Sequence, residues 1–202
     1  MAAGQKLAGK HVAILATDGV EQVELAEPRE ALDDAGATTT LIAPKAGKIK
    51  AWQHDHWGDD LTVDLALDQA RPDDFDALML PGGVMNPDRL RMDQRAVNFV
   101  RAMFNAGKPV AAICHGPWLL VEADVVRNRS LTSWPSLKTD LRNAGADWSD
   151  QEVVTDMGLV TSRKPDDIPA FNRKMLEEFA EGVHERRAES AKLAPEQTLA
   201  SQ

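Results

Sequence analysis

Short apolar runs alternate with helical patterns along most of this chain, and this alternation limits the folds that it can adopt. Repeated strand–helix alternation is typical of a mostly parallel sheet with helices on both faces, so we predict an α/β fold. Residues 47–64 break the alternation, and we interpret them as a loop or a β-excursion at one edge of the sheet. Strands are predicted at residues 12–16, 39–43, 77–80, 110–113, 131–133, 153–154 and 159–161, and helices at 21–35, 93–106, 119–126, 137–141 and 168–179.

Several helix ends have local signals. Asp93 has the short acceptor side chain of an N-cap, and Gly107 follows the amphipathic pattern that begins there. Pro28 lies inside the pattern of residues 21–35, where proline removes a backbone donor. We therefore expect a kink or a late start in that helix.

Size and charge exclude several classes of protein. The 202 residues suit a single α/β domain, 1–202, with its core at about 11–182 and a polar tail at 183–202. A formal net charge of −9 argues against strong nucleic-acid binding. No apolar run approaches the roughly 18 residues of a membrane span, and residues 1–10 lack the apolar centre of a signal peptide. We expect a cytoplasmic protein with no membrane partner.

One cysteine is present, in the stretch AAICHGPW at residues 111–118. An apolar strand pattern precedes Cys114, and Pro117 fits the first turn of a helix, where its missing N–H costs nothing. The cysteine is therefore predicted on a strand-to-helix turn, like the nucleophile elbow of hydrolases. There, the start of the helix favours the thiolate, and backbone N–H groups near Gly116 can hold an oxyanion.

The structural alternative for Cys114 is a buried, inert thiol, which the elbow position disfavours. His115 is expected to point away from the sulfur, because the side chains of adjacent residues diverge; it can relay a proton in another arrangement or cap the helix. A single cysteine excludes an internal disulfide and a cysteine-rich zinc site. We predict no cofactor and no metal.

Acidic residues and paired glycines follow two other strands of the predicted sheet. Glu21 and Glu24 are three residues apart and can share a helix face. A protonated acid there can donate a hydrogen bond to the thiolate, whereas two solvated first-turn glutamates are the structural alternative. Gly82 and Gly83 follow the strand at 77–80, where paired glycines let the backbone approach a ligand or simply form a turn.

A second candidate site lies in the segment 47–64. His54 and His56 are separated by Asp55, a spacing that suits two metal ligands on a strand. We favour a structural or subunit-contact loop for this stretch.

Several stretches of the chain together resemble the PfpI family, the branch named for an intracellular protease within the superfamily of the parkinsonism-associated deglycase and the class I glutamine amidotransferase domains. The resemblance covers about residues 11–180 and implies a flavodoxin-like three-layer sandwich. The matching stretches are ATDGVEQVEL, FDALMLPGG, AAICHGP, TSWPSLKTDLRNAGA and LVTSRKPDDIPAF.

The resemblance also implies roles for individual residues. It places the family's nucleophilic cysteine at Cys114 and its neighbouring histidine at His115. The protonated glutamate that hydrogen-bonds the cysteine corresponds to Glu24, and a second acid of the same pocket corresponds to Glu21. Gly82, Gly83, Gly116, Pro117 and Trp134 are expected to form the oxyanion site and the pocket walls.

Two positions depart from the family pattern. Asp88 corresponds to an acid that some members supply from the adjacent subunit, but the loop here is one residue longer and the acid is Asp rather than Glu. Trp134 stands where the family often has tyrosine, so a hydroxyl near the pocket is missing. The resemblance implies a homodimer or higher homo-oligomer, in which Asp88 would reach a neighbour's His115.

The resemblance leaves two functions open. In the first, Cys114 attacks an electrophilic carbonyl of a small carbonyl compound or a peptide, as a deglycase, glyoxalase or peptidase does. In the second, the protein is a stress sensor or holdase chaperone whose cysteine is oxidised to sulfenic or sulfinic acid. We reject a glutamine amidotransferase, because the late His184 and the adjacent Glu185 lack the spacing of that catalytic pair.

Overall fold

A seven-stranded sheet forms the centre of the molecule in the computed structural model, which describes residues 6–185 and 187. Its strands lie in the order β10-β11-β7-β6-β1-β2-β5, and all neighbours are parallel except the antiparallel pair β10–β11. The order β2-β1-β6-β7-β11 is that of flavodoxin-like folds, with a switch point between β1 and β6. The strands are β1 (His11–Leu15), β2 (Thr38–Ala43), β5 (Leu65–Ala66), β6 (Ala77–Leu80), β7 (Val110–Ile113), β10 (Val153–Asp156) and β11 (Leu159–Ser162).

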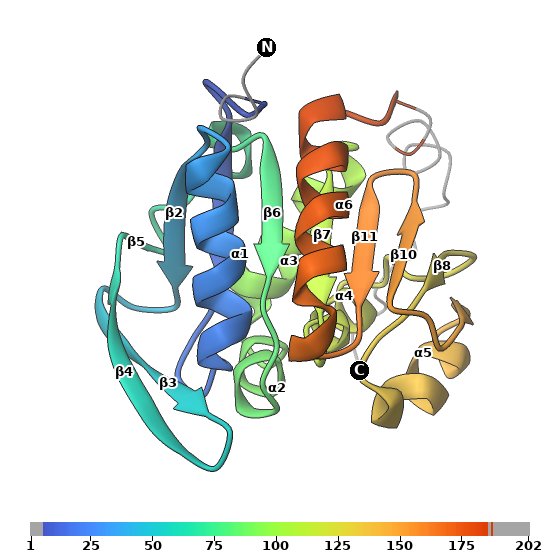
Figure 1. Cartoon of the computed structure of the whole chain (residues 1–202), viewed down its shortest axis with the longest axis horizontal. Coiled ribbons are helices and arrows are strands. Elements are labelled where there is room, and N and C mark those ends of the chain that lie inside the picture. Colours follow the sequence, from blue (N-terminus) through green and yellow to red (C-terminus); the bar gives the residue numbers. More distant parts are fainter. Residues whose placement is uncertain (1–5, 186, 188–202) are drawn as a thin grey trace, which may run out of the picture.

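Helices cover both faces of this sheet, so the prediction of a mostly parallel α/β sandwich is confirmed. Figure 1 shows α1 and α6 in front of the sheet and α3 and α4 behind it. Alternate residues of β1 point into two separate cores: Ile14 packs beneath α1 and α6, and Leu15 packs against α3 and α4. The helices are α1 (Gln22–Asp34), α2 (Met85–Leu90), α3 (Gln94–Asn105), α4 (Pro117–Glu122), α5 (Lys138–Asn143) and α6 (Ile168–Glu181).

The local signals place most elements correctly. The side chain of Asp93 accepts a hydrogen bond from the N–H of Arg95, as its N-cap signal predicts. Helix α1 begins at Gln22 and continues through Pro28, so a late start is wrong. Helix α2 was not predicted, because its Asn and Pro residues are typical of a loop. The strand expected at 131–133 is a short parallel pair instead, β8 (Ser130–Leu131) with β9 (Asp147–Trp148).

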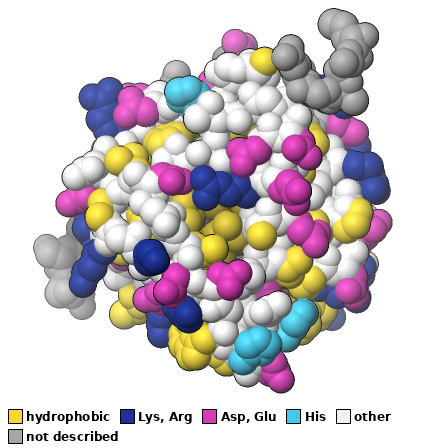
Figure 2. All heavy atoms as spheres, turned by 60° about the vertical axis from the view of Figure 1, so that its left-hand side comes forward, with side chains coloured by type: hydrophobic (Ala, Val, Ile, Leu, Met, Phe, Trp, Pro, Cys, Tyr) yellow, Lys and Arg dark blue, Asp and Glu magenta, His cyan; other side chains and the backbone are white. Residues whose placement is uncertain are grey.

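Residues 47–64 contain an antiparallel hairpin, β3 (Gly47–Gln53) and β4 (His56–Val63), which is the β-excursion expected there. The hairpin is tied to the loop after β1, because the N–H of Trp52 donates to the carbonyl of Val20 at 2.7 Å. Figure 2 views the side that carries the hairpin and shows basic side chains interspersed among acidic ones.

The predicted polar tail falls partly within the described residues. Arg187 is buried there and donates hydrogen bonds to the carbonyls of Phe104, Met157 and Lys108, so a purely surface tail is wrong at this position. Residues 186 and 188–202 lie outside the described part of the chain. Within the described part, every helix is too short or too polar to cross a membrane.

Candidate active site

Cys114 lies on the predicted strand-to-helix turn, one residue beyond β7. Its backbone has φ +61°, in the left-handed region that residues other than glycine rarely adopt. Its N–H donates to the carbonyl of Ser162 at 3.0 Å, and the N–H of Gly116 closes the turn on Ile113 at 2.9 Å. Helix α4 then begins at Pro117. These two hydrogen bonds hold the turn in a strained backbone conformation. Strained residues of this kind are found mostly at functional sites.

His115 points at the sulfur, contrary to the expectation that the two side chains diverge. Its Nδ1 lies 3.2 Å from Cys114 Sγ. Neighbouring side chains diverge from an extended backbone, but the left-handed φ of Cys114 turns the chain and brings both side chains to one side. The structure therefore places a proton acceptor or donor beside the thiol from the adjacent residue.

Two indoles enclose the imidazole of His115. The Trp134 ring stacks on it with centroids 5.8 Å apart and planes at 23°, and the Trp118 ring is 5.2 Å away at 59°. Burial lowers the pKa of His115 from 6.5 to about 4, because the cation loses its hydration. His115 is consequently neutral at physiological pH. At this position Trp134 supplies an aromatic wall and no hydroxyl.

Glu24 lies completely buried next to the thiol. Its Oε2 accepts a hydrogen bond from the N–H of Gly82 at 3.0 Å, whereas its buried Oε1 has no hydrogen-bond partner among the described residues. Burial, with a smaller contribution from the nearby charge of Glu21, raises the pKa of Glu24 from 4.5 to about 8. The solvated alternative is therefore wrong for Glu24, which is protonated at neutral pH.

The prediction of a lowered thiol pKa is not borne out. Burial raises the pKa of Cys114 well above its ordinary value, and the charge of Glu24 and its contact with the thiol add to this effect. The last two causes disappear when Glu24 is protonated. The backbone N–H groups of Gly83 and His115 act in the opposite direction, because they stabilise the thiolate. Gly83 is one of the residues expected at the oxyanion site.

The paired glycines pack against the site as expected for a close backbone approach. A Cβ on Gly82 would overlap the carboxylate of Glu24 and lie 2.7 Å from the Cβ of Cys114. Gly83 has φ +80° and packs against the carbonyl of Gly19. Both positions therefore require glycine.

Asn86 positions this glycine turn, and the sequence analysis missed it. The side chain is buried, and its Nδ2 donates to the carbonyls of Pro81 and Gly82 at 2.9 and 3.1 Å. Its Oδ1 accepts from the N–H of Thr17 at 2.8 Å, which joins the loops after β6 and β1. An asparagine three residues after a Pro-Gly-Gly turn is the one available signal, and it is a weak one.

Glu21 and Asp88 lie at the margin of the site. Glu21 is half-buried, and its Oε1 accepts from the N–H of His54 at 3.3 Å, so it anchors the β3–β4 hairpin. Asp88 is exposed in the first turn of α2 and forms no hydrogen bond or ion pair with the rest of the described chain. Its contact with a neighbour's His115 stays a prediction.

Possible metal ligands lie elsewhere in the molecule. Glu178, Glu181 and His184 have their ligand atoms within 4.8 Å of one another near the end of α6. His184 donates its N–H to Gly107, just before β7 begins, so this group is at the opposite edge of the sheet from Cys114. His56 pairs with Asp55 at 2.7 Å at the exposed turn of the hairpin.

Comparison with known proteins decides the family. The model of the DJ-1/PfpI family matches residues 10–178, which is most of the chain. The chain belongs to the DJ-1/PfpI family. This confirms the resemblance inferred from the motifs around Glu24, Cys114 and Arg163.

Individual relatives match this chain over most of their own length. Protein/nucleic acid deglycase 2 of Escherichia coli (strain K12) is 48% identical over 168 residues, 83% of this chain and 96% of that protein. General stress protein 18 of Bacillus subtilis (strain 168) is 46% identical over 170 residues, with the same coverage of 83% and 96%. The crystal structure of Drosophila melanogaster DJ-1beta superposes with a TM-score of 0.77 and 28% identity, covering 90% of this chain and 95% of that one.

Proposed function

We propose that this protein is a cysteine-dependent hydrolase of the deglycase or peptidase type, which acts on electrophilic carbonyls with Cys114 as its nucleophile. The left-handed backbone of Cys114 carries the proposal. Such a conformation costs about 1–3 kcal/mol and persists only where the surrounding structure enforces it. A structural thiol needs no such turn, whereas a nucleophile does, because the turn presents the sulfur above the sheet edge.

The neutral state of the site defines the first chemical step. At pH 7 the pKa values of about 8 for Glu24 and about 4 for His115 leave a carboxyl, a neutral imidazole and a thiol side by side. His115 acts here as the tautomer that carries its proton on Nε2, so its Nδ1 is a free acceptor. As the bond from Cys114 Sγ to the carbonyl carbon forms, the thiol proton passes to this Nδ1. The π electron pair moves to the carbonyl oxygen, which takes up that proton and completes a hemithioacetal.

Hydrogen-bond donors around the sulfur stabilise the negative charge on Cys114 Sγ as its proton leaves. The N–H groups of Gly83 and His115 are directed at the reacting atom and need no reorganisation. Protonated Glu24 adds no negative charge to the site. The arrangement favours a small carbonyl or its adduct with an amino or thiol group, and the name of the Escherichia coli relative, a deglycase, agrees with that substrate class.

Turnover of a model adduct tests the proposal. The full chain is incubated with the adducts of methylglyoxal with N-acetylcysteine and with N-acetylarginine, and the release of lactate is measured for the wild type, Cys114→Ser and Glu21→Gln. We expect catalytic release of lactate that Cys114→Ser abolishes and Glu21→Gln retains in part. Equal release by the wild type and Cys114→Ser would overturn the proposal.

The alternative of a stress sensor or holdase uses the same sulfur. The name of General stress protein 18 agrees with it. With one cysteine in the chain, no second thiol can resolve a sulfenic acid. Oxidation of Cys114 under mild peroxide, together with no lactate release, would favour the sensor.

A further inference from the structure

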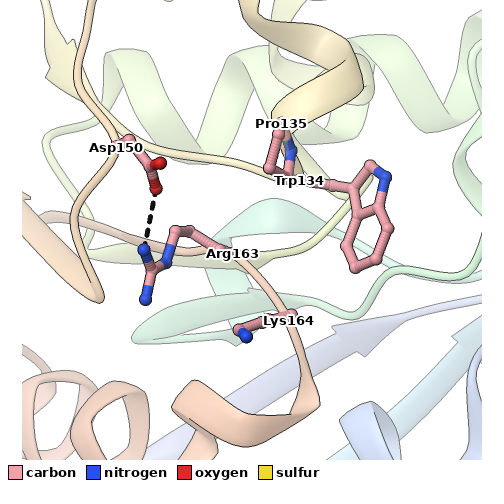
Figure 3. A pocket seen from close by; sticks show the side chains of 5 residues that line it. All are labelled: Trp134, Pro135, Asp150, Arg163 and Lys164. Atoms are coloured by element: carbon pink, nitrogen blue, oxygen red, sulfur yellow. Dashed lines mark hydrogen bonds and ion pairs between the residues drawn. The ribbon is translucent and has the colours of Figure 1, made fainter.

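A pocket of about 350 Å³ lies directly beside the cysteine turn and has no role in the step described above. It is lined by Trp134, Pro135, Asp150, Arg163 and Lys164 (Figure 3). Two backbone hydrogen bonds connect its walls to the turn. The N–H of Trp134 donates to the carbonyl of Cys114 at 2.9 Å, and the N–H of Cys114 donates to the carbonyl of Ser162, the residue before Arg163.

Trp134 belongs both to this pocket and to the cysteine site. Its ring stacks on His115, whose Nδ1 contacts the sulfur, and the ring is also part of the pocket wall. Figure 3 shows Arg163 and Lys164 between Asp150 on one side and the Trp134 indole on the other. A group bound there therefore contacts the same indole that stacks on His115.

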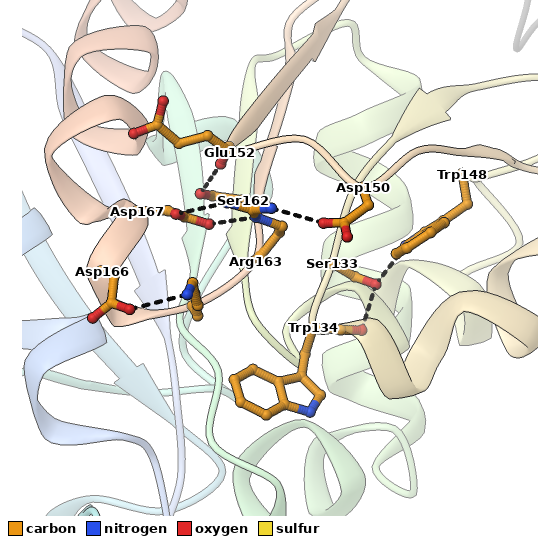
Figure 4. Close-up of polar contacts among 10 residues, drawn as sticks. Ser133, Trp134, Trp148, Asp150, Glu152, Ser162, Arg163, Asp166 and Asp167 are labelled. Carbon is orange, nitrogen blue, oxygen red and sulfur yellow. Dashed lines mark hydrogen bonds and ion pairs between the residues drawn. The ribbon is translucent and has the colours of Figure 1, made fainter.

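Arg163 is fixed by carboxylates of the protein itself. Its Nε and one terminal nitrogen donate to both oxygens of Asp167 at 2.8 and 3.1 Å, and the other donates to Asp150 at 2.7 Å (Figure 4). A bidentate pair of this kind is strong and geometrically defined. Arg163 thus shapes the pocket but offers little unused hydrogen-bonding capacity.

Lys164 is the cation available to a ligand. Its Nζ pairs only with Asp166, at 3.0 Å, in the described part of the chain. The two side chains are 40% and 80% exposed, and an exposed pair of this kind contributes little because water competes with it. An incoming anion can therefore exchange with Asp166 at small cost, whereas the partly buried, bidentate pair of Arg163 with Asp167 stays intact.

We infer that this pocket binds a carboxylate of the substrate through Lys164, with Trp134 and Pro135 packing against the adjoining carbon atoms. The inference rests on the proposed function and narrows its substrate class to carbonyl compounds that carry a carboxylate near the electrophilic carbon. A monoanion fits better than a dianion, because Asp150 lines the pocket and Asp166 pairs with Lys164, and their negative charge opposes a second charge on the ligand.

Two alkylating reagents of nearly equal shape test the inference without requiring turnover. Iodoacetate carries a carboxylate and iodoacetamide does not. In both, Cys114 Sγ loses its proton and bonds to the CH2 carbon, and iodide leaves. The rate constant with iodoacetate divided by that with iodoacetamide is the readout. Lys164→Gln is expected to lower this ratio about threefold to tenfold, the range of a partly exposed charge pair. Asp166→Asn is expected to raise it, because it frees the ammonium group.

The matched control is Lys174→Gln, which removes the same charge from an exposed pair with Glu177 on α6. It corrects for the net charge of the protein and is expected to leave the ratio within twofold of the wild type. An unchanged ratio in both Lys164→Gln and Asp166→Asn would overturn the carboxylate site.

A second measurement separates this site from the proposed function. If neither reagent modifies Cys114, the proposed nucleophile fails, and the pocket is tested by titrating ¹⁵N-labelled protein with acetate and with acetamide. A shift of the Trp134 indole N–H resonance with acetate alone, lost in Lys164→Gln, would support the carboxylate site. Equal shifts with both compounds would overturn it.

Discussion

Replacing Glu24 by glutamine is expected to change how the stability of the protein depends on pH. Glutamine keeps an acceptor for the N–H of Gly82 and nearly the same volume, but it has no proton to lose. In the wild type, burial raises the pKa of Glu24 from 4.5 to about 8. Between these two values the folded state holds a proton that the unfolded state has lost. The free energy of unfolding therefore falls as pH rises through this window.

The size of the effect follows from the two pKa values. Each unit of difference corresponds to about 1.4 kcal/mol, so between pH 5.5 and pH 8 the contribution of Glu24 falls by about 3 kcal/mol. His115 has the opposite sign. Its folded pKa of about 4 lies below its ordinary 6.5, so the unfolded state binds the extra proton and stability rises with pH up to about 6.5. The wild type should be nearly flat below pH 6.5 and lose stability from there to pH 8.

Urea unfolding at several pH values between 5.5 and 8 measures this directly. The difference in unfolding free energy between Glu24→Gln and the wild type cancels the contribution of His115 and should grow by about 3 kcal/mol across the range. Glu27→Gln, at an exposed position on the same helix, is the control and should follow the wild type. A difference that is constant within about 0.5 kcal/mol over this range would refute the raised pKa of Glu24.

Two further changes test the packing of the site. Gly82→Ala places a methyl group against the carboxylate of Glu24 and the Cβ of Cys114. The rate of thiol alkylation by iodoacetamide should therefore fall about tenfold or more. The free energy of unfolding, measured in urea, should fall by about 2 kcal/mol. Trp134→Ala exposes one face of His115, so the pKa of that imidazole should rise by about one unit toward its ordinary value, as measured by NMR titration of its ring protons.

Each of these variants has a matched control. Gly58→Ala adds its methyl group against the movable end of Gln22 and should leave alkylation unchanged. Trp57→Ala removes an exposed indole from the hairpin and should leave the His115 titration unchanged. Normal alkylation in Gly82→Ala would mean that the glycine turn does not pack on the thiol. An unshifted titration in Trp134→Ala would mean that the indole does not cause the burial.

The turn at Cys114 was predictable because its signals are local. The apolar run of β7 and the proline at the start of α4 lie within a few residues of the cysteine and specify a strand, a sharp turn and a helix. The loops after β1, β6 and β7 meet because parallel strands end at one edge of a sheet, so the approach of Glu24 and Gly82 followed from the alternation itself.

Other features depend on contacts that the sequence does not display. The direction of His115 depends on one backbone angle at Cys114, and the sequence favoured the ordinary extended geometry. The thiol pKa was expected to fall because the helix start was considered alone. The depth of burial, which raises it, depends on Ile113, Val160 and other residues of the core beneath α1 and α6. Asn86 acts through three backbone groups of two separate loops, and none of them adjoins it in sequence.

The burial of Glu24 itself argues for a role in chemistry. At pH 8 and above, a carboxyl group with a pKa of about 8 destabilises the fold by roughly 4 to 5 kcal/mol relative to an exposed one. A leucine in the same place would fill the space between α1 and β6 without that penalty. The carboxyl group is instead directed at the N–H of Gly82 and at the one thiol of the chain, and one of its oxygens has no partner among the described residues. A protonated acid held beside a strained cysteine can supply or withhold a proton as the sulfur changes charge, and an apolar side chain cannot.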